Sequence, residues 1–129
     1  MAVTHTTAAR NAATDAVTAL IGASGKLKFR LAGTVGAPGV AVATLSLSAT
    51  AFGASATGTA TAAAITSDTA AAGNASAVAT ATLETSVGTV VIHCAVAASA
   101  SDINMTNGLT VAAGDTVSCS ALTYTALPS

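Results

Sequence analysis

Small side chains dominate this sequence and limit the kind of core that it can build. Alanine, threonine, serine and glycine supply 80 of the 129 residues, and 35 of these are alanine. Because apolar burial stabilises by roughly 25 cal/mol per Å², an alanine-rich core contributes much less than one built from leucine and phenylalanine. An isolated chain of this size would be only marginally stable. We therefore expect part of its stability to come from contacts with copies of itself or with a partner surface.

The length and the hydropathy are those of one folded domain. A chain of 129 residues suffices for one core, and a mean hydropathy of +0.71 is too high for a disordered chain. No run of residues is apolar and long enough for a membrane helix. Residues 1–10 lack a basic segment followed by an apolar one, so we expect no secretory signal and synthesis in the cytoplasm, with reduced thiols at Cys94 and Cys119.

Charged residues are too few to indicate an electrostatic partner. Four basic and five acidic residues give a formal net charge of -1. Nucleic-acid binding usually needs a basic patch that neutralises several phosphates, and the cluster of Lys26, Lys28 and Arg30 is small for that purpose. We expect neither nucleic acid nor a membrane among the partners of this chain.

An amphipathic helix is expected in residues 6–22. Thr6 or Thr7 can cap its start, and Gly22 with Gly25 can end it. Apolar residues at spacings of three and four draw one stripe, as is typical of a helix that packs against a core. The stripe consists of Ala9, Ala13, Ala16, Val17, Leu20 and Ile21.

A change to two-residue periodicity after Gly25 predicts a half-buried strand in residues 26–31. Leu27, Phe29 and Leu31 share one face of this strand, and the three cations share the other. A solvated strand face explains the cations most simply, although a row of three could also meet an acidic neighbour.

Several further strands are expected along the chain. Residues 89–96 have the strongest β-branched character, which predicts a central strand buried on both faces. Residues 109–125 are expected to form a strand, a tight turn and a strand, and so a closing hairpin. A change of phase near Ala43 and Thr44 indicates either a bulge or a back face of small residues. Other strands are expected in residues 40–48, in the second half of residues 50–64 and in residues 75–84, with turns at residues 33–39 and 65–74.

A single helix followed by strands, without alternation of strand and helix, predicts a mainly β protein. We expect an antiparallel sandwich or barrel, of the jelly-roll or immunoglobulin-like kind, with one N-terminal α-helix. Residues 1–24 would form the helix and an anchor, and residues 25–129 would form one compact β-domain.

Two histidines and two cysteines raise the question of a metal site. Cys94 follows His93 in a predicted strand, where adjacent side chains point to opposite faces, so the two cannot easily share one ion. Cys94 and Cys119 could meet across neighbouring strands, but no CxxC or HxxxH spacing is present. We expect no metal and no cofactor, and we interpret the cysteines as small buried residues. A cross-strand disulfide after cell lysis stays open.

No set of residues predicts catalysis. Serines are so abundant that a match to a nucleophilic triad would be accidental, so we expect no catalytic residues and no enzyme. Asp68, Asp102 and Asp115 lie in predicted turns, where each carboxylate can accept hydrogen bonds from local backbone amides. Residues 33–36 lack the spacing of a nucleotide-binding glycine loop.

Several short phrases of the sequence are similar to those of a known group of proteins. They are GKLKFRLAG (residues 25–33), SATAFGAS (48–55), AITSD (64–68) and VAAGDTVS (111–118). In these phrases, and through most of its length, the chain resembles small virion proteins of tailed bacteriophages. The resemblance implies a structural role in the capsid, tail or fibre, and no catalytic residues carry over from it.

Among these virion roles we expect a capsid decoration or cement protein that docks repeatedly on the shell. Its partners would be copies of itself, in a trimer, and the major capsid protein or another virion protein. The N-terminal helix, or the residues before it, would anchor the chain to the shell or to a sister subunit. The alternative is a tail or fibre protein that binds a receptor or glycan through loops such as residues 102–107. The scarcity of aromatic residues, with Tyr124 as the single tyrosine, counts against sugar recognition.

Overall fold

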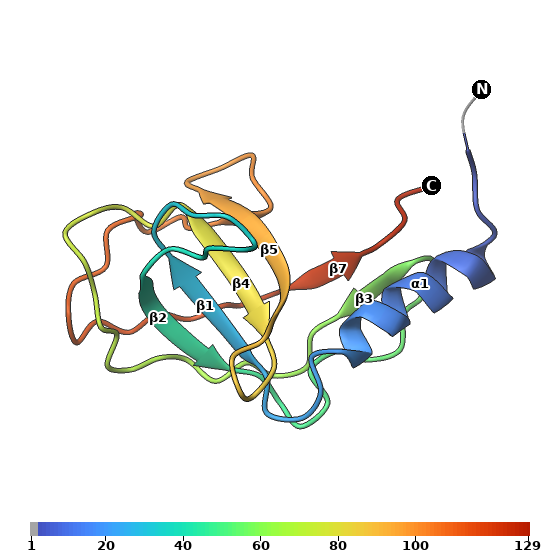
Figure 1. Ribbon diagram of the computed structural model, residues 1–129, viewed down its shortest axis with the longest axis horizontal. Helices are drawn as coiled ribbons and strands as arrows, with labels where there is room; N and C mark the ends of the chain where they lie inside the picture. The colour runs from blue at the N-terminus through green and yellow to red at the C-terminus, as the bar shows by residue number, and fades with distance from the viewer. Residues whose placement is uncertain (1–2) are drawn as a thin grey trace.

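The computed structural model describes residues 3–129 and is mainly β, with one helix at its N-terminal end, as the sequence predicts (Figure 1). The elements in this part of the chain are α1 (Thr7–Ala19), β1 (Lys26–Arg30), β2 (Ala41–Ser46), β3 (Thr59–Thr61), β4 (Thr80–Glu84), β5 (Val90–Ala97), β6 (Ile103–Asn104) and β7 (Thr123–Thr125). Five strands form one sheet in the order β2-β1-β4-β5-β6, and β3 pairs with β7 in a second, small sheet.

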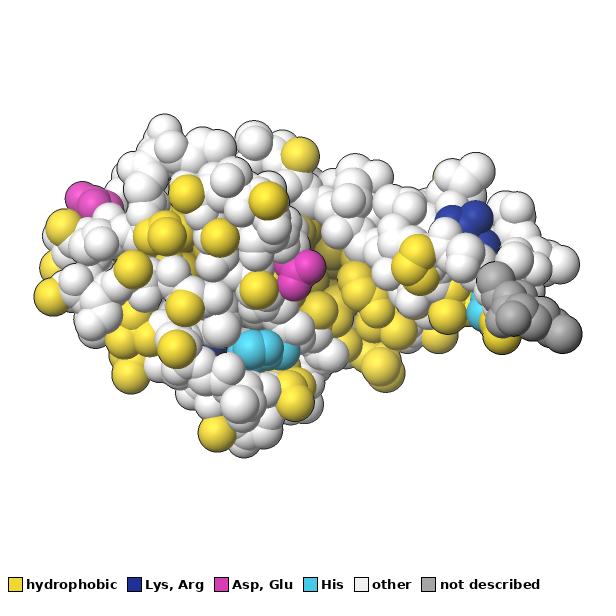
Figure 2. All heavy atoms as spheres, turned by 90° about the horizontal axis from the view of Figure 1, so that it is seen from above, with side chains coloured by type: hydrophobic (Ala, Val, Ile, Leu, Met, Phe, Trp, Pro, Cys, Tyr) yellow, Lys and Arg dark blue, Asp and Glu magenta, His cyan; other side chains and the backbone are white. Residues whose placement is uncertain are grey.

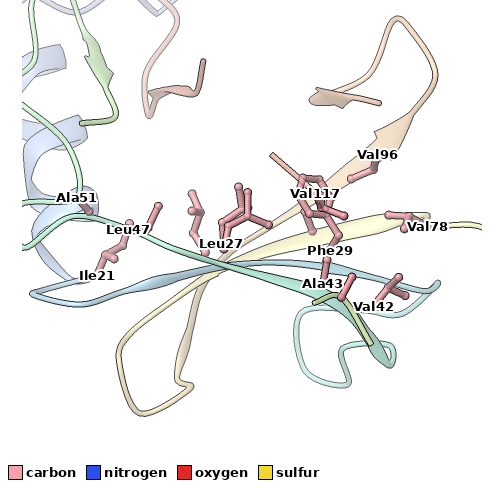
Figure 3. Packing of buried hydrophobic residues seen from close by; sticks show 14 of the residues in the cluster. Ile21, Leu27, Phe29, Val42, Ala43, Leu47, Ala51, Val78, Val96 and Val117 are labelled. Carbon is pink, nitrogen blue, oxygen red and sulfur yellow. The ribbon is translucent and has the colours of Figure 1, made fainter. Parts of the chain in front are cut away.

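The five-stranded sheet curls into a half-barrel and carries the core on one side (Figures 1 and 3). Its pairs are antiparallel except for β5 and β6, which run parallel. The predicted alternation of β1 is confirmed, because Leu27 and Phe29 are buried whereas the three cations that alternate with them are only half-buried. Leu27 lies opposite Leu45 of β2 and Leu83 of β4, so three leucines from adjacent strands form one row of the core.

The bulge predicted in β2 is present. Phe29 pairs with Ala43, whereas the next residue, Arg30, pairs with Ala41, which leaves Val42 as the extra residue. Val42 and Ala43 are both buried. The bulge therefore accommodates two successive buried residues on β2.

The strand buried on both faces is β4, and the prediction that residues 89–96 would be that strand is wrong. All five residues of β4 are buried, whereas β5 is mostly half-buried and Ala95 is exposed. β4 lies in the middle of the sheet, and β5 lies next to the edge strand β6. β-Branched residues favour a strand without fixing its place in a sheet.

The closing hairpin predicted for residues 109–125 does not form. Its turn is present, since Asp115 N donates to Ala112 O, but the residues on both sides of the turn bond to residues 68–78. Asp68 and Val117 form an isolated bridge, and Val78 N donates to Leu109 O. Beyond this region the chain enters β7, which pairs with β3. The local turn signal was correct, but the pairing partners lie far away in the sequence.

α1 has the predicted boundaries, but the apolar stripe predicted to face the core is only partly buried. Thr6 caps its start by accepting a hydrogen bond from Ala9 N at 3.2 Å, and Gly22 follows its end at φ +69°. The buried residues of α1 are Thr14 and Thr18. The predicted apolar stripe is divided: Ile21 is buried, Ala13 and Val17 are half-buried, and Ala9, Ala16 and Leu20 are exposed. The helix therefore packs on the small sheet through polar side chains. No helix in residues 3–129 has the length and apolar character needed to cross a membrane.

Hydrogen bonds to backbone groups explain why polar side chains of α1 face the protein. Thr14 Oγ1 donates to Gly58 O at 2.6 Å and accepts from Ala126 N at 3.1 Å. Asn11 Oδ1 accepts from Gly58 N at 2.7 Å, and Asp15 Oδ1 accepts from Ser55 N at 2.9 Å. Small residues let the helix approach these turns closely, and backbone groups that leave water in this way need polar partners.

Thr14→Val should lower the free energy of unfolding by about 1–3 kcal/mol, because Gly58 O and Ala126 N would lose their buried partner. Urea denaturation followed by circular dichroism measures the change. Thr7→Val serves as the control, since Thr7 is exposed on the same helix. Equal stability of the two variants would show that the Thr14 hydroxyl does not hold the helix in place.

Candidate functional site

Two features of residues 3–129 are candidates for a functional site. One is a polar network on the side of the half-barrel opposite the core, formed by Lys28, Arg30, Thr82 and Glu84, with His93 beside it. The other is an open groove lined mainly by residues 102–108 and 115–123.

The polar network is centred on Glu84, a fully buried carboxylate. Its Oε2 accepts hydrogen bonds from Arg30 Nη2 at 2.7 Å and from Thr82 Oγ1, and its Oε1 lies 3.3 Å from Lys28 Nζ. Arg30 also donates to Thr82 Oγ1 at 3.0 Å and to Gly39 O at 2.7 Å. The guanidinium thereby ties two strands and the loop between β1 and β2 to one carboxylate.

The surroundings of Glu84 keep it ionised. Burial by itself would raise the pKa of Glu84, but hydrogen bonds from Arg30 and Thr82 and the ion pair with Lys28 outweigh that effect. The pKa therefore lies below its ordinary value of 4.5. Glu84 is therefore paired as a carboxylate with Lys28 and Arg30. This pairing stabilises the sheet, and an ionised Glu84 has no carboxyl proton to donate.

The sequence favoured a solvated strand face for the cations of β1, and these side chains are only partly exposed to solvent. The side chains of Lys28 and Arg30 are 25% and 13% exposed, and both pair with Glu84. Lys26 instead donates to Ser46 Oγ at 3.1 Å. Glu84 is thus the acidic neighbour that the second interpretation of these cations required. Sequence reasoning could not name Glu84, because only the register of β1 against β4 brings it there.

His93 and Cys94 lie on opposite faces of β5, as predicted. His93 pairs with Thr82, on the side of the polar network, and its buried Nε2 has no hydrogen-bond partner in the described part of the chain. Cys94 pairs with Ala81 on the core side. Burial, together with the charge of Asp102, raises the pKa of Cys94 to about 11, so this thiol is a poor nucleophile at neutral pH.

The thiols and carboxylates do not gather in one place. Cys94 and Cys119 are free thiols, and burial raises the pKa of Cys119 as well. Among residues 3–129, no three histidine, cysteine or acidic side chains lie close enough to hold a metal ion. Asp102 accepts from Ala95 N at 2.9 Å and Asp115 from Ala112 N at 3.0 Å. Asp68 accepts from Ala70 N at 3.0 Å. The predicted bonding to local backbone amides is therefore confirmed for Asp68 and Asp115, whereas Asp102 bonds to an amide of β5 seven residues away.

The groove has a volume of about 550 Å³ and is open to solvent. The loop proposed for glycan recognition, residues 102–107, lines it together with Cys119. Its single aromatic lining residue is Phe29, which is 2% exposed and belongs to the core. Tyr124 does not line it. The groove therefore lacks the exposed aromatic face on which a sugar ring would stack.

No matching protein indicates a role for the polar network or for the groove. Comparisons with protein-family models, with curated proteins and with solved structures give no match. The chemistry of particular side chains and surfaces of this chain is therefore the basis for its function.

Glu84→Gln tests the polar network. It removes the charge that pairs with Lys28 and Arg30, and we expect it to lower the free energy of unfolding by about 3 kcal/mol at neutral pH. Because the folded-state pKa is lowered, the stabilisation is present above pH 4.5 and is lost as the pH falls through the folded-state value. Denaturation at a series of pH values should therefore show a flatter acid profile for this variant than for the wild type.

Asp115→Asn is the matched control for that experiment, because Asp115 is an exposed carboxylate at a turn. It should keep the acid dependence of the wild type. Parallel profiles for Glu84→Gln and the wild type would contradict the assignment of the acid sensitivity to Glu84.

Proposed function

We propose that this chain is a structural protein of a bacteriophage virion, and that it docks repeatedly on the capsid shell as a decoration or cement protein that stabilises it. The observation that carries the proposal is a wholly apolar, exposed side of α1. We call this side the apolar arc. It consists of Ala8, Ala9, Ala12, Ala16, Ala19 and the capping residue Leu20, and all six are exposed.

The apolar arc reverses the usual arrangement of a surface helix. Such a helix normally turns its apolar side to the core and its polar side to water. Here Asn11, Thr14 and Asp15 bond to the rest of the chain, which leaves the alanine side outward and Leu20 65% exposed. Hydrophobic side chains gather where the half-barrel meets the narrower end of the molecule (Figure 2). Contiguous exposed apolar surface usually marks an interaction site.

The size of the apolar arc supports attachment at many equivalent points. A helix of 13 residues is about 20 Å long and about 10 Å wide, so the arc offers about 200 Å². Stable interfaces bury about 800 Å² on each partner. One such contact is weak, but the contacts of copies joined in an oligomer would add up through multivalency on a symmetric shell. Alanine side chains also permit close approach of the partner's backbone.

The sequence resemblance and the composition support the same role. A decoration protein needs a stable β scaffold and a surface that fits identical sites, and its partners would be the major capsid protein and copies of itself. The polar network and the half-barrel provide the scaffold. The proposal includes no catalytic step, cofactor, nucleic acid or membrane.

A receptor- or glycan-binding protein of the tail or fibre is the second candidate. The groove beside residues 102–107 favours it, and the absence of an exposed aromatic residue from the groove lining counts against it. The copy number separates the two roles. Quantitative mass spectrometry of purified virions should find the chain in numbers close to those of the major capsid protein. A few copies per particle would move it to the tail, and its absence from the particle would refute both roles.

Ala12→Glu and Ala16→Glu test the apolar arc directly. A carboxylate buried in an apolar contact without a partner is costly, so each substitution should weaken binding to undecorated shells at least about tenfold, or ~1.4 kcal/mol. Co-sedimentation with the shells measures the binding, and thermal unfolding checks that the fold is intact. Ala37→Glu is the matched control, because Ala37 is exposed on the loop between β1 and β2. Binding of the arc variants at the strength of this control would refute the anchoring role.

A further inference from the structure

Asn107 is followed by Gly108 in the segment after β6, and both residues line the groove. Both are exposed, and Gly108 has a φ of +108°. Glycine adopts such an angle readily because it has no Cβ. Apart from the chain neighbours of Gly108, no atom lies within 4 Å of the position that a Cβ on this residue would occupy. The described chain therefore leaves open space beside Gly108.

Asn107 differs from the other three asparagines of the chain in the hydrogen bonds of its side chain. The side-chain oxygen of each of the others accepts a hydrogen bond from a backbone amide. These pairs are Asn11 with Gly58 N at 2.7 Å, Asn74 with Ser76 N at 2.9 Å, and Asn104 with Ser101 N at 3.0 Å. The side chain of Asn107 has no such partner among residues 3–129. Its carboxamide can therefore change rotamer without breaking a bond to the protein.

The amide of Gly108 is also without a partner. Its nitrogen makes no hydrogen bond of normal geometry with a backbone or side-chain group of the described chain. Asn104 is the closest comparison, because it is also exposed and lines the same groove, but the amide that follows it is held: Met105 N donates to Ala97 O at 2.9 Å. Of these two asparagines, only Asn107 has both a mobile carboxamide and an unbonded amide nitrogen next to it.

We propose that Asn107 is a modification site, at which the side-chain amide is lost by spontaneous deamidation with water as the co-reactant. Once the Gly108 amide has lost its proton, its nitrogen attacks Asn107 Cγ and a succinimide ring forms. The bond from Cγ to Nδ2 breaks, and ammonia leaves with that proton. Water then opens the ring. Cleavage between the ring nitrogen and Cγ gives aspartate, and cleavage between that nitrogen and the main-chain carbonyl carbon gives isoaspartate.

Either product changes the groove. The lining already contains Asp102 and Asp115 and no lysine or arginine, and the reaction adds a carboxylate to it. Isoaspartate also lengthens the main chain by one methylene at this position. The formal net charge of the chain, which is -1 at neutral pH, becomes one unit more negative. The proposal concerns this segment alone and does not depend on the proposed virion role.

Incubation of the full chain at mildly alkaline pH tests the proposal. Peptide mapping by mass spectrometry follows amide loss at each asparagine, and chromatography separates the aspartate and isoaspartate peptides. We expect amide loss at Asn107 to be at least about tenfold faster than at Asn104 in the same folded protein. The rate should rise with pH, because the Gly108 amide must lose its proton before it attacks. A smaller difference between the two asparagines would overturn the proposal.

The same measurement on the chain unfolded in urea separates the effect of the fold from that of the local sequence. A hydrogen bond that holds the side chain or the following amide must open before the ring can form. The ratio of the unfolded rate to the folded rate should therefore be at least about tenfold larger for Asn104 than for Asn107. Ratios closer than that would show that the fold restrains both sites alike, and would overturn the structural basis of the proposal.

Two matched variants identify the residue by its charge. Anion-exchange chromatography of the incubated wild type should show a new, more acidic species. Asn104→Gln should show it too, and Asn107→Gln should not, because glutamine would have to close a larger ring. Thermal unfolding checks that each variant is folded. Persistence of the acidic species in Asn107→Gln would assign the reaction to another residue and refute the site.

Discussion

Side-chain hydrogen bonds to backbone groups hold α1 on the rest of the protein, and they take the place of large apolar contacts. Thr14 joins the turn at Gly58 to Ala126 near the C-terminal end. This single hydroxyl links segments that lie 44 and 112 residues away from it in the sequence. The polar side of α1 is therefore used inside the protein, and the alanine side is left outside. The apolar arc, on which the proposed function rests, is a direct consequence.

The polar network has a comparable role for the half-barrel. Leu27 and Phe29 fill one side of β1, while Lys28 and Arg30 reach Glu84 on the other side. A charge pair of this kind does not add much stability compared with apolar residues of the same size, but breaking it leaves an unpaired charge in the interior. It therefore favours the observed register of β1 against β4, because a shift by one residue would place the cations in the core.

The sequence predicted those features that depend on near neighbours in the chain. The mainly β class, the caps of α1, the alternation of β1, the bulge at Ala43 and the turns at Asp68 and Asp115 all follow from short patterns and are confirmed. The predictions that failed depend on long-range pairing. β-Branched residues did not make β5 the buried strand, and the turn at residues 112–115 did not produce a hairpin. Likewise, the pairing of Glu84 with the cations and the presence of the groove could not be predicted, because both depend on segments that lie far apart in the sequence.

The hydrogen bonds between α1 and the C-terminal residues also determine how the protein would respond to mechanical force. Arg10 Nε donates to Leu127 O at 3.0 Å, and His5 Nδ1 lies 2.8 Å from Ser129 O, so both ends of the described chain are fastened at one end of the molecule. Tension applied between these ends would load the contacts between α1 and residues 126–129 first. The half-barrel would bear no load until those contacts had separated, so a pull of this kind would detach the helix while the sheet stayed folded.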